Sequence, residues 1–221
     1  MTETTIPDPF VRELKPHEER ALRRVHNRLS GWATRQKCAR DIECCTNPRT
    51  KKELQEKLEE LNAMKGGTIS KLDVSEMLRW LGRPSNKRYV REMIWEADET
   101  LNGCIDWEEL KLCLQRNVSD QTGLEPSKLY NLVQFMIFDQ NENGFVSVDE
   151  TLGFLQARYG RAGLEFKLRE LFGDDMVETG SEGGEISFLQ YLDAVNRAQL
   201  SMYENSEFGQ AALAKSGRQK A

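Results

Sequence analysis

Apolar residues recur every three or four positions in a series of segments between residues 74 and 195, the spacing that places them on one face of an α-helix. The stripes leading into a polar loop are Val90, Met93, Ile94 and Ala97; Leu129, Leu132, Val133 and Met136; and Leu164, Leu168 and Leu171. The stripes following a loop are Val74, Met77, Leu78 and Leu81; Trp107, Leu110 and Leu114; Val148, Leu152 and Leu155; and Phe188, Tyr191, Leu192 and Val195. The pattern predicts an all-α fold.

Four loops between these helices repeat one arrangement, in which an Ile or Val follows a Gly by two residues. The aliphatic residues are Ile69, Ile105, Val146 and Ile186, separated by 36, 41 and 40 residues. That spacing suits a helix, a loop of twelve residues and a second helix. The sequence therefore predicts four helix-loop-helix units, with loops at residues 62–73, 98–109, 139–150 and 179–190.

A polar stretch at residues 117–126, with a Gly and a Pro, is typical of a boundary between two lobes. We predict an N-terminal arm over 1–50, a first lobe over 51–117, a linker over 118–125, a second lobe over 126–200 and a tail over 201–221.

The loop at 139–150, D-Q-N-E-N-G-F-V-S-V-D-E, has the composition of a calcium site. Ca²⁺ takes six to eight oxygen ligands, which a twelve-residue loop supplies from positions 1, 3, 5, 7, 9 and 12. The candidate ligands are Asp139, Asn141, Asn143, the carbonyl of Phe145, Ser147 and Glu150. Gly144 suits the sharp turn at position 6, and Val146 can pair with a neighbouring loop.

The loop at 98–109, D-E-T-L-N-G-C-I-D-W-E-E, follows the same alternation. Its candidate ligands are Asp98, Thr100, Asn102, the carbonyl of Cys104, Asp106 and Glu109. Thr100 is the weakest of these positions because it offers a neutral hydroxyl, so lower affinity is expected here.

Both loops, their flanking helices and the fourfold repeat resemble the EF-hand superfamily of calmodulin, troponin C and centrin, over residues 52–200. The resemblance implies two EF-hand lobes, Ca²⁺ as the bound ion, and calcium-regulated binding of partner helices.

The outer two loops depart from the family pattern. Met64 and Gly66 occupy ligand positions in 62–73, with Asp73 in place of the bidentate Glu, while 179–190 has Thr179 and Gln190 at its two essential carboxylate positions. We expect these degenerate loops to bind calcium poorly and to pair structurally, first with second and fourth with third. Three acidic residues ahead of the fourth loop offer an alternative approach to a cation, namely Asp174, Asp175 and Glu178.

The N-terminal arm is basic, with twelve Lys and Arg against five Asp and Glu between Phe10 and Lys52. A basic amphipathic helix is predicted there, with the apolar stripe Leu22, Val25, Leu29 and Trp32 and with Arg24 and Arg28 among its cations. Three interpretations stay open: a helix packed on the first lobe, a partner-binding segment that docks on another protein such as a cytoskeletal assembly, or, as the remainder, an autoinhibitory segment in the protein's own groove or a contact with lipid or nucleic acid.

Composition narrows the function classes. The formal charge is −5, and there are two histidines and five cysteines. With no C-x-x-C pair, a zinc site or a histidine general base has few candidates, and we expect no enzyme, small-molecule substrate or nucleic-acid partner. The acidic N-terminus with Thr at position 2, and the lack of an apolar run of spanning length, favour a cytoplasmic protein without a membrane span.

Two hypotheses about function remain. The first is a calcium sensor or regulatory subunit that exposes a groove for a partner helix, lined by Met93, Phe135, Met136, Trp107 and Phe138. The second is a constitutive structural subunit of a cytoskeletal assembly, such as a flagellar axoneme, in which calcium is incidental.

Overall fold

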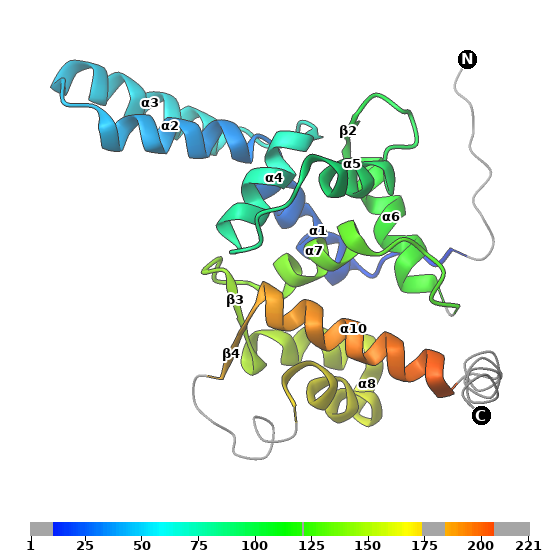
Figure 1. Cartoon of the computed structure of the whole chain (residues 1–221). Helices are drawn as coiled ribbons and strands as arrows, with labels where there is room; N and C mark the ends of the chain where they lie inside the picture. The colour runs from blue at the N-terminus through cyan, green and yellow to red at the C-terminus, as the bar shows by residue number, and fades with distance from the viewer. Residues whose placement is uncertain (1–10, 121, 174–183, 206–221) are drawn as a thin grey trace, which may run out of the picture. The chain divides into compact units, whose positions relative to one another are not determined.

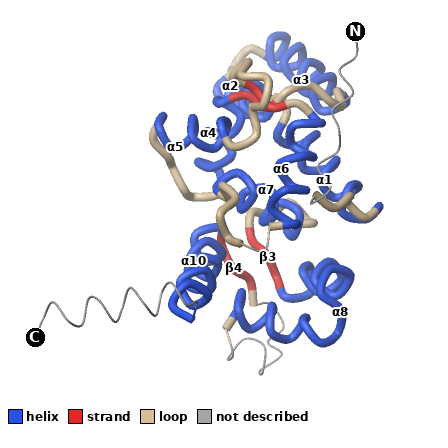
Figure 2. The backbone as a smooth tube through the Cα atoms, turned by 90° about the vertical axis from the view of Figure 1, so that its right-hand side faces the viewer, coloured by secondary structure: helices blue, strands red, loops and turns tan. Residues whose placement is uncertain are grey.

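The computed structural model describes residues 11–120, 122–173 and 184–205, and there the chain is almost entirely helical (Figures 1 and 2). In chain order the elements are α1 (Pro16–Leu29), α2 (Trp32–Cys44), α3 (Pro48–Ala63), β1 (Ile69–Ser70), α4 (Lys71–Trp80), α5 (Lys87–Trp95), β2 (Cys104–Ile105), α6 (Trp107–Ser119), α7 (Lys128–Phe138), β3 (Phe145–Ser147), α8 (Val148–Phe172), β4 (Glu185–Ser187) and α10 (Phe188–Asn205). The all-α prediction is confirmed. Within the described ranges, none of the helices combines the length and apolar character needed to cross a membrane.

The short strands join the loops in pairs. In the first unit β1 pairs antiparallel with β2, with Ile69 opposite Ile105. In the second unit β3 pairs with β4, with Val146 opposite Ile186. The four aliphatic residues of the repeat are buried, so each pair of loops shares an apolar centre. The expected pairing of first with second and third with fourth loop is confirmed.

The core of the first unit includes α1. Leu22, Val25 and Leu29 are at most 1% exposed, and α1 packs against α4 and α6. Burial of a Leu or Val side chain stabilises a fold by about 1.5–3 kcal/mol, so these three residues contribute several kcal/mol before the entropy of ordering the helix is subtracted. The apolar stripe of the basic arm is therefore part of the protein's own core.

The basic helix is shorter than the sequence analysis predicted. It ends at Leu29, and α2 begins at Trp32. Gly31 lies between them with φ 70°, a left-handed conformation that a side chain would strain. The prediction of one helix carrying Leu22 through Trp32 is thus wrong, because the chain changes direction at Gly31.

Beyond this break, α2 and α3 form an antiparallel pair, and α2 also packs against α4 (Figure 1). The contact between α2 and α3 includes Cys38, which is buried and whose Sγ lies 3.4 Å from the carbonyl oxygen of Leu54. Helix α3 has no fully buried residue. It therefore belongs to the fold mainly through α2.

Helix α7 is attached to the first unit at both of its ends. The backbone N–H of Leu129 donates to Glu96 Oε2 at 2.8 Å, which satisfies one of the free donors of the first turn. Arg24 Nη2 donates to the carbonyl oxygens of Met136 and Ile137, each at 3.0 Å, and so places a cation at the negative end of the helix dipole.

These caps agree with the division of the chain into two compact units, Met1–Ile137 and Phe138–Ala221. The polar stretch at 118–125 predicts the division there instead. The difference arises because polar composition indicates a surface loop, whereas long-range caps decide to which unit the next helix belongs.

The second unit contains the last two loops. Its core includes Phe138, with the rings of Phe154 and Tyr191 at centroid distances of 5.7 and 6.4 Å in edge-on arrangements. Helix α8 joins two predicted helices, and Gly160, at φ 69°, marks the kink where one ends and the next begins. The exiting helix of the third unit and the entering helix of the fourth are consequently almost continuous in sequence.

The Arg24 cap can be tested by Arg24→Ala. We expect the free energy of unfolding in urea to decrease by about 1–2 kcal/mol, because two carbonyl oxygens and the end of the helix dipole lose their cation. Arg20→Ala is the matched control, since Arg20 is an exposed arginine of the same helix. Equal losses in the two variants would show that the cap contributes nothing specific.

A pH effect is expected from His26, which packs edge-on against Trp107 at a centroid distance of 5.6 Å. Burial, and then the charge of Arg23, lower the pKa of His26 below 6.5, against a weaker opposing effect of Asp106. In the unfolded chain His26 takes up a proton near pH 6.5, whereas in the folded chain it takes one up only at lower pH. The free energy of unfolding therefore decreases as pH falls below 6.5.

We predict that the thermal unfolding midpoint drops less between pH 7.5 and 5.5 in His26→Phe than in the wild type. Phe keeps an aromatic ring against Trp107 but cannot titrate. Repeating the comparison in a His17→Gln background removes the chain's other imidazole, so any remaining difference belongs to His26. Parallel decreases with and without the imidazole of His26 would contradict the assignment.

Candidate metal-binding loops

The loop at 139–150 begins directly after α7 and folds around its first carboxylate. Asp139 is fully buried, and its Oδ1 and Oδ2 accept hydrogen bonds from the backbone N–H groups of Asn143 at 3.0 Å and Gly144 at 3.2 Å. Gly144 has φ 86° and Glu142 has φ 62°. Two left-handed residues in three positions turn the backbone sharply, so that the N–H groups of positions 5 and 6 face position 1.

The last residue of this loop, Glu150, is folded onto the same backbone. Its Oε1 accepts from the N–H groups of Gln140 and Asn141, both at 3.1 Å, and its Oε2 accepts from that of Ser147 at 3.0 Å. Both carboxylates of the loop are therefore held by its own amides. These hydrogen bonds already restrict both side chains, and Glu150 has to exchange its own for an ion when both of its oxygens turn toward the loop centre.

Helix α6 begins within the loop at 98–109, which repeats this geometry. Asp98 accepts from the backbone N–H groups of Asn102 at 3.0 Å and Gly103 at 2.8 Å. Glu109 Oε1 accepts from the N–H and the hydroxyl of Thr100, at 3.0 and 2.9 Å, and its Oε2 accepts from the N–H of Asp106 at 2.9 Å. The Thr100 hydroxyl is thus engaged with Glu109. The two loops are equivalent in backbone, including a left-handed residue at position 4, here Leu101.

The middle positions of both loops orient their amide side chains alike. Asn102 Oδ1 accepts from the N–H of Cys104, and Asn143 Oδ1 accepts from that of Phe145, each at 2.8 Å. These oxygens belong to the predicted position-5 ligands, and the N–H groups belong to the residues whose carbonyls are the predicted position-7 ligands.

Positions 9 and 12 form a helix cap in all four loops. The pairs are Ser70 with Asp73, Asp106 with Glu109, Ser147 with Glu150, and Ser187 with Gln190. In each, the first side chain accepts from the N–H of the second residue, and the second accepts from the N–H of the first. The capping-box pattern is visible in the sequence, so this arrangement could have been predicted. The cap also explains why the degenerate loops keep a polar residue at position 12.

In the first loop the carboxylate at position 12 serves two helices. Asp73 Oδ2 accepts from the N–H of Ser70 at 2.9 Å, while Oδ1 accepts from the N–H of Ala33, in the first turn of α2, at 2.9 Å. Asn27 Oδ1 accepts from the N–H of Gly66 at 3.1 Å. This loop is consequently tied to α1 and α2 by groups that a calcium site would need to redirect.

The fourth loop is described from residue 184 onward. The alternative acidic approach through Asp174, Asp175 and Glu178, and the position of Thr179, lie outside the described residues. Glu185, at position 7 of this loop, accepts from Asn143 Nδ2 at 3.3 Å. No ligand spacing in the sequence points to this carboxylate, because only the strand pairing brings it beside the third loop.

The donor set of each site depends on neutral oxygens. Within residues 11–120, 122–173 and 184–205, no three Asp, Glu, His or Cys side chains are gathered as a metal cluster. The loop at 139–150 has only two carboxylates among its predicted ligands, so amide, hydroxyl and carbonyl oxygens must supply the rest. That donor set fits a hard cation with flexible geometry, such as Ca²⁺, better than a metal that prefers nitrogen or sulfur.

The predicted partner-binding residues lie within the first unit itself. Leu22, Val25 and Leu29 are buried, and Arg24 caps α7. The Arg28 guanidinium lies 5.6 Å from the ring centroid of Trp32 and 4.9 Å from that of Trp80, and these two rings meet edge-on at 5.8 Å.

In this conformation the apolar face is therefore not presented to another protein, in contrast to the docking interpretation. Helix α1 instead occupies its own lobe, which agrees with the packed and autoinhibitory interpretations.

The predicted groove residues are also covered. Met93, Phe135, Met136 and Phe138 are at most 3% exposed. Trp107 lies under the guanidinium of Arg23, 3.2 Å from its ring centroid. In the first unit, α1 thus covers the residue at the start of α6.

A thiol-based site at Cys38 or Cys113 has little support. Cys38 and Cys113 are buried, and burial raises the pKa of the Cys113 thiol to about 12. A thiol that stays protonated is a poor nucleophile and a poor metal ligand.

Comparison with known proteins agrees with the loop geometry. The family model of an EF-hand domain pair matches residues 65–117 and 103–158. The chain is 30% identical to the probable calcium-binding protein CML17 of Arabidopsis thaliana over 149 residues, which are 66% of this chain and 87% of that protein. It is 28% identical to the probable calcium-binding protein CML11 of Oryza sativa subsp. japonica over 148 residues, 66% of this chain and 67% of that protein. With this similarity, two pairs of EF-hand loops and their oxygen-rich ligand sets, the chain belongs to the EF-hand calcium-binding proteins of the calmodulin superfamily.

Proposed function

We propose that the protein is a calcium sensor or regulatory subunit that responds to Ca²⁺ at two loops by changing its binding to a partner protein. The ligands would be the six groups of the 139–150 loop, from Asp139 to Glu150, and the corresponding groups of the 98–109 loop, from Asp98 to Glu109. The observation that carries the proposal is the arrangement of Glu150 and Asp139, both held on the loop backbone by its own N–H groups.

The position-12 glutamates would transmit the signal. Glu109 and Glu150 are each the third residue of the helix that follows the loop. A glutamate that turns both oxygens toward an ion must move relative to the first turn of its helix, so the helix is displaced with it. In the first unit this displacement involves α6, which carries Trp107 beneath Arg23.

Helix α1 would set the threshold for opening. It packs on α6 and covers Trp107, and an exposed groove in the first lobe requires that this contact be broken or carried along. Ca²⁺ can shift such an equilibrium only by its difference in affinity for the closed and open conformations. Partial opening, or opening helped by a partner, is the expected behaviour.

The alternative function is a constitutive subunit of a cytoskeletal assembly, for which a flagellar axoneme is one candidate location and the cytoplasm the general one. Two observations favour it. Asp73 is committed to the caps of α2 and α4, and α1 fills the first lobe. A lobe ordered by its own side chains does not need an ion to keep its shape.

Calorimetric titration with Ca²⁺ in millimolar Mg²⁺ tests the proposed ligands. We expect the wild type to bind one or two ions, and Glu150→Gln to weaken the tighter site by at least about tenfold, because a neutral amide cannot bind an ion with two anionic oxygens. Glu165→Gln is the control, since Glu165 is an exposed glutamate of α8 beyond the kink at Gly160.

Unchanged affinity in Glu150→Gln would refute the ligand set. The two functions are separated by following an environment-sensitive hydrophobic dye during the same titration. A calcium-dependent rise in dye fluorescence supports the sensor, whereas calcium uptake with no rise supports the constitutive subunit.

A second prediction concerns Glu185, the carboxylate from the partner loop. We expect Glu185→Gln to weaken calcium binding at the 139–150 loop by roughly two- to fivefold, the effect of removing one exposed charge near a cation. Because exposed charges are screened, the difference from wild type should shrink as NaCl is raised from 50 to 500 mM. If affinity is the same at low salt, Glu185 only supports the strand pairing.

A further inference from the structure

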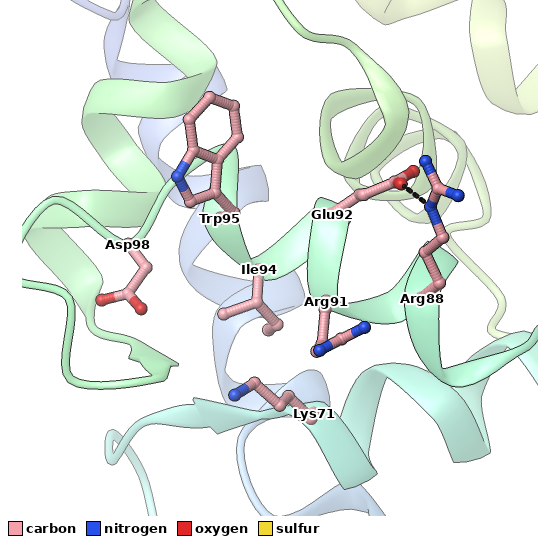
Figure 3. A pocket seen from close by; sticks show the side chains of 7 residues that line it. All are labelled: Lys71, Arg88, Arg91, Glu92, Ile94, Trp95 and Asp98. Carbon is pink, nitrogen blue, oxygen red and sulfur yellow. Dashed lines mark hydrogen bonds and ion pairs between the residues drawn. The ribbon is translucent and has the colours of Figure 1, made fainter.

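A cationic pocket lies beside the second loop in the first unit. This open depression of about 640 Å³ is lined by Lys71 at the start of α4, by Arg88, Arg91 and Trp95 of α5, and by Asp98. Figure 3 shows Lys71 and Arg91 near one another on one side of Ile94, with the ring of Trp95 on its other side; all four residues line the depression. Apart from Asp98, these side chains are not among the proposed calcium ligands. They are also not among the residues described above as contacts of α1.

The charges of the pocket are unbalanced. Glu92, the other carboxylate of the lining, is already shared between Arg88 at 2.9 Å and Lys128 at 2.6 Å. The hydrogen bond from Lys128, followed by that from Arg88, lowers the pKa of Glu92, so it stays ionised and occupied. Lys71 and Arg91 have no ion pair with any residue in the part of the chain that the structure describes.

Trp95 adds an apolar surface to these cations. Its side chain is 69% exposed, although α5 is amphipathic and buries Val90, Met93 and Ile94. An exposed indole beside cations offers a contact for an apolar side chain while the cations engage acidic groups. A solvated basic surface would need no such indole.

Lys71 links the pocket to the calcium loop. A Cβ added to Gly103 would lie 3.4 Å from Lys71 Nζ, so the ammonium lies over the turn of the 98–109 loop. Asp98, at position 1 of that loop, borders the pocket. An ion held by the loop would offset the negative charge of Asp98 and make the pocket more positive.

We propose that this pocket binds an acidic segment of a partner protein, with carboxylates at Lys71 and Arg91 and an apolar side chain on Trp95. Ca²⁺ in the 98–109 loop strengthens the interaction. The calcium dependence rests on the function proposed above, whereas the binding of the segment does not. A peptide supplies both carboxylates and an apolar group, which match the two kinds of side chain that line the pocket.

The test is fluorescence anisotropy of a labelled Glu-Glu-Glu-Phe-Glu-Glu peptide with the full chain, in Ca²⁺ and in chelator. We expect the double variant Lys71→Gln, Arg91→Gln to bind the peptide at least about tenfold more weakly, since two charge-assisted contacts are lost. The matched control is Lys51→Gln, Lys57→Gln, which removes two exposed charges of α3 and should change binding less than about twofold.

A second variant and a competitor make the result specific. Trp95→Ala should lower the affinity for the Phe-containing peptide more than the affinity for the same peptide with Ser in place of Phe. Inorganic phosphate at millimolar concentration should not displace the peptide. Equal losses in the pocket and control variants, or tighter binding to phosphatidylserine vesicles that excludes the peptide, would overturn the proposal.

Calcium calorimetry on the same samples separates the two proposals. Normal calcium uptake with no pocket-dependent peptide binding rejects the pocket and leaves the proposed function standing. Absent calcium uptake rejects the proposed function, while the comparison of pocket and control variants in chelator still decides whether the pocket binds the peptide.

Discussion

The pairing of loops through Ile69 with Ile105 and Val146 with Ile186 is the constraint on which the rest of the structure depends. Each strand is only two or three residues long, and a strand of that length has no stability alone. Its backbone groups find partners only in another loop, and its aliphatic side chain is buried only there. A loop that binds no ion therefore remains necessary, because the calcium-binding loop beside it would otherwise lose its strand partner and the apolar contact of its aliphatic residue.

The cap at positions 9 and 12 explains how folding and ion binding use the same residues. Glu109 and Glu150 satisfy the first turns of α6 and α8 and also hold the loop amides. Asp73 and Gln190 retain the cap alone. Loss of the bidentate carboxylate thus removes a calcium ligand at small cost to the helix, so a degenerate loop can persist as a structural element.

Helix α1 gives the first unit a different character from a simple EF-hand pair. Its apolar stripe is buried in the core, Arg24 caps α7, and Arg23 covers Trp107. The surface that a partner helix would use in an open lobe is thereby engaged within the chain. A partner that binds elsewhere on this unit, at a surface that α1 leaves exposed, meets no such competition.

The sequence by itself determined the all-α class, the four helix-loop-helix units and the residues at each loop position, because helical periodicity and ligand spacing are local properties of the chain. Tertiary structure alone decided that Gly31 breaks the basic helix, that α1 packs inside the first unit, and that Glu96 and Arg24 attach α7 to it. It also brought Glu185 beside Asn143, and Lys71 into one pocket with Arg91. Periodicity shows that a helix has an apolar face, but which surface covers that face depends on contacts between residues far apart in sequence, and no local pattern records them.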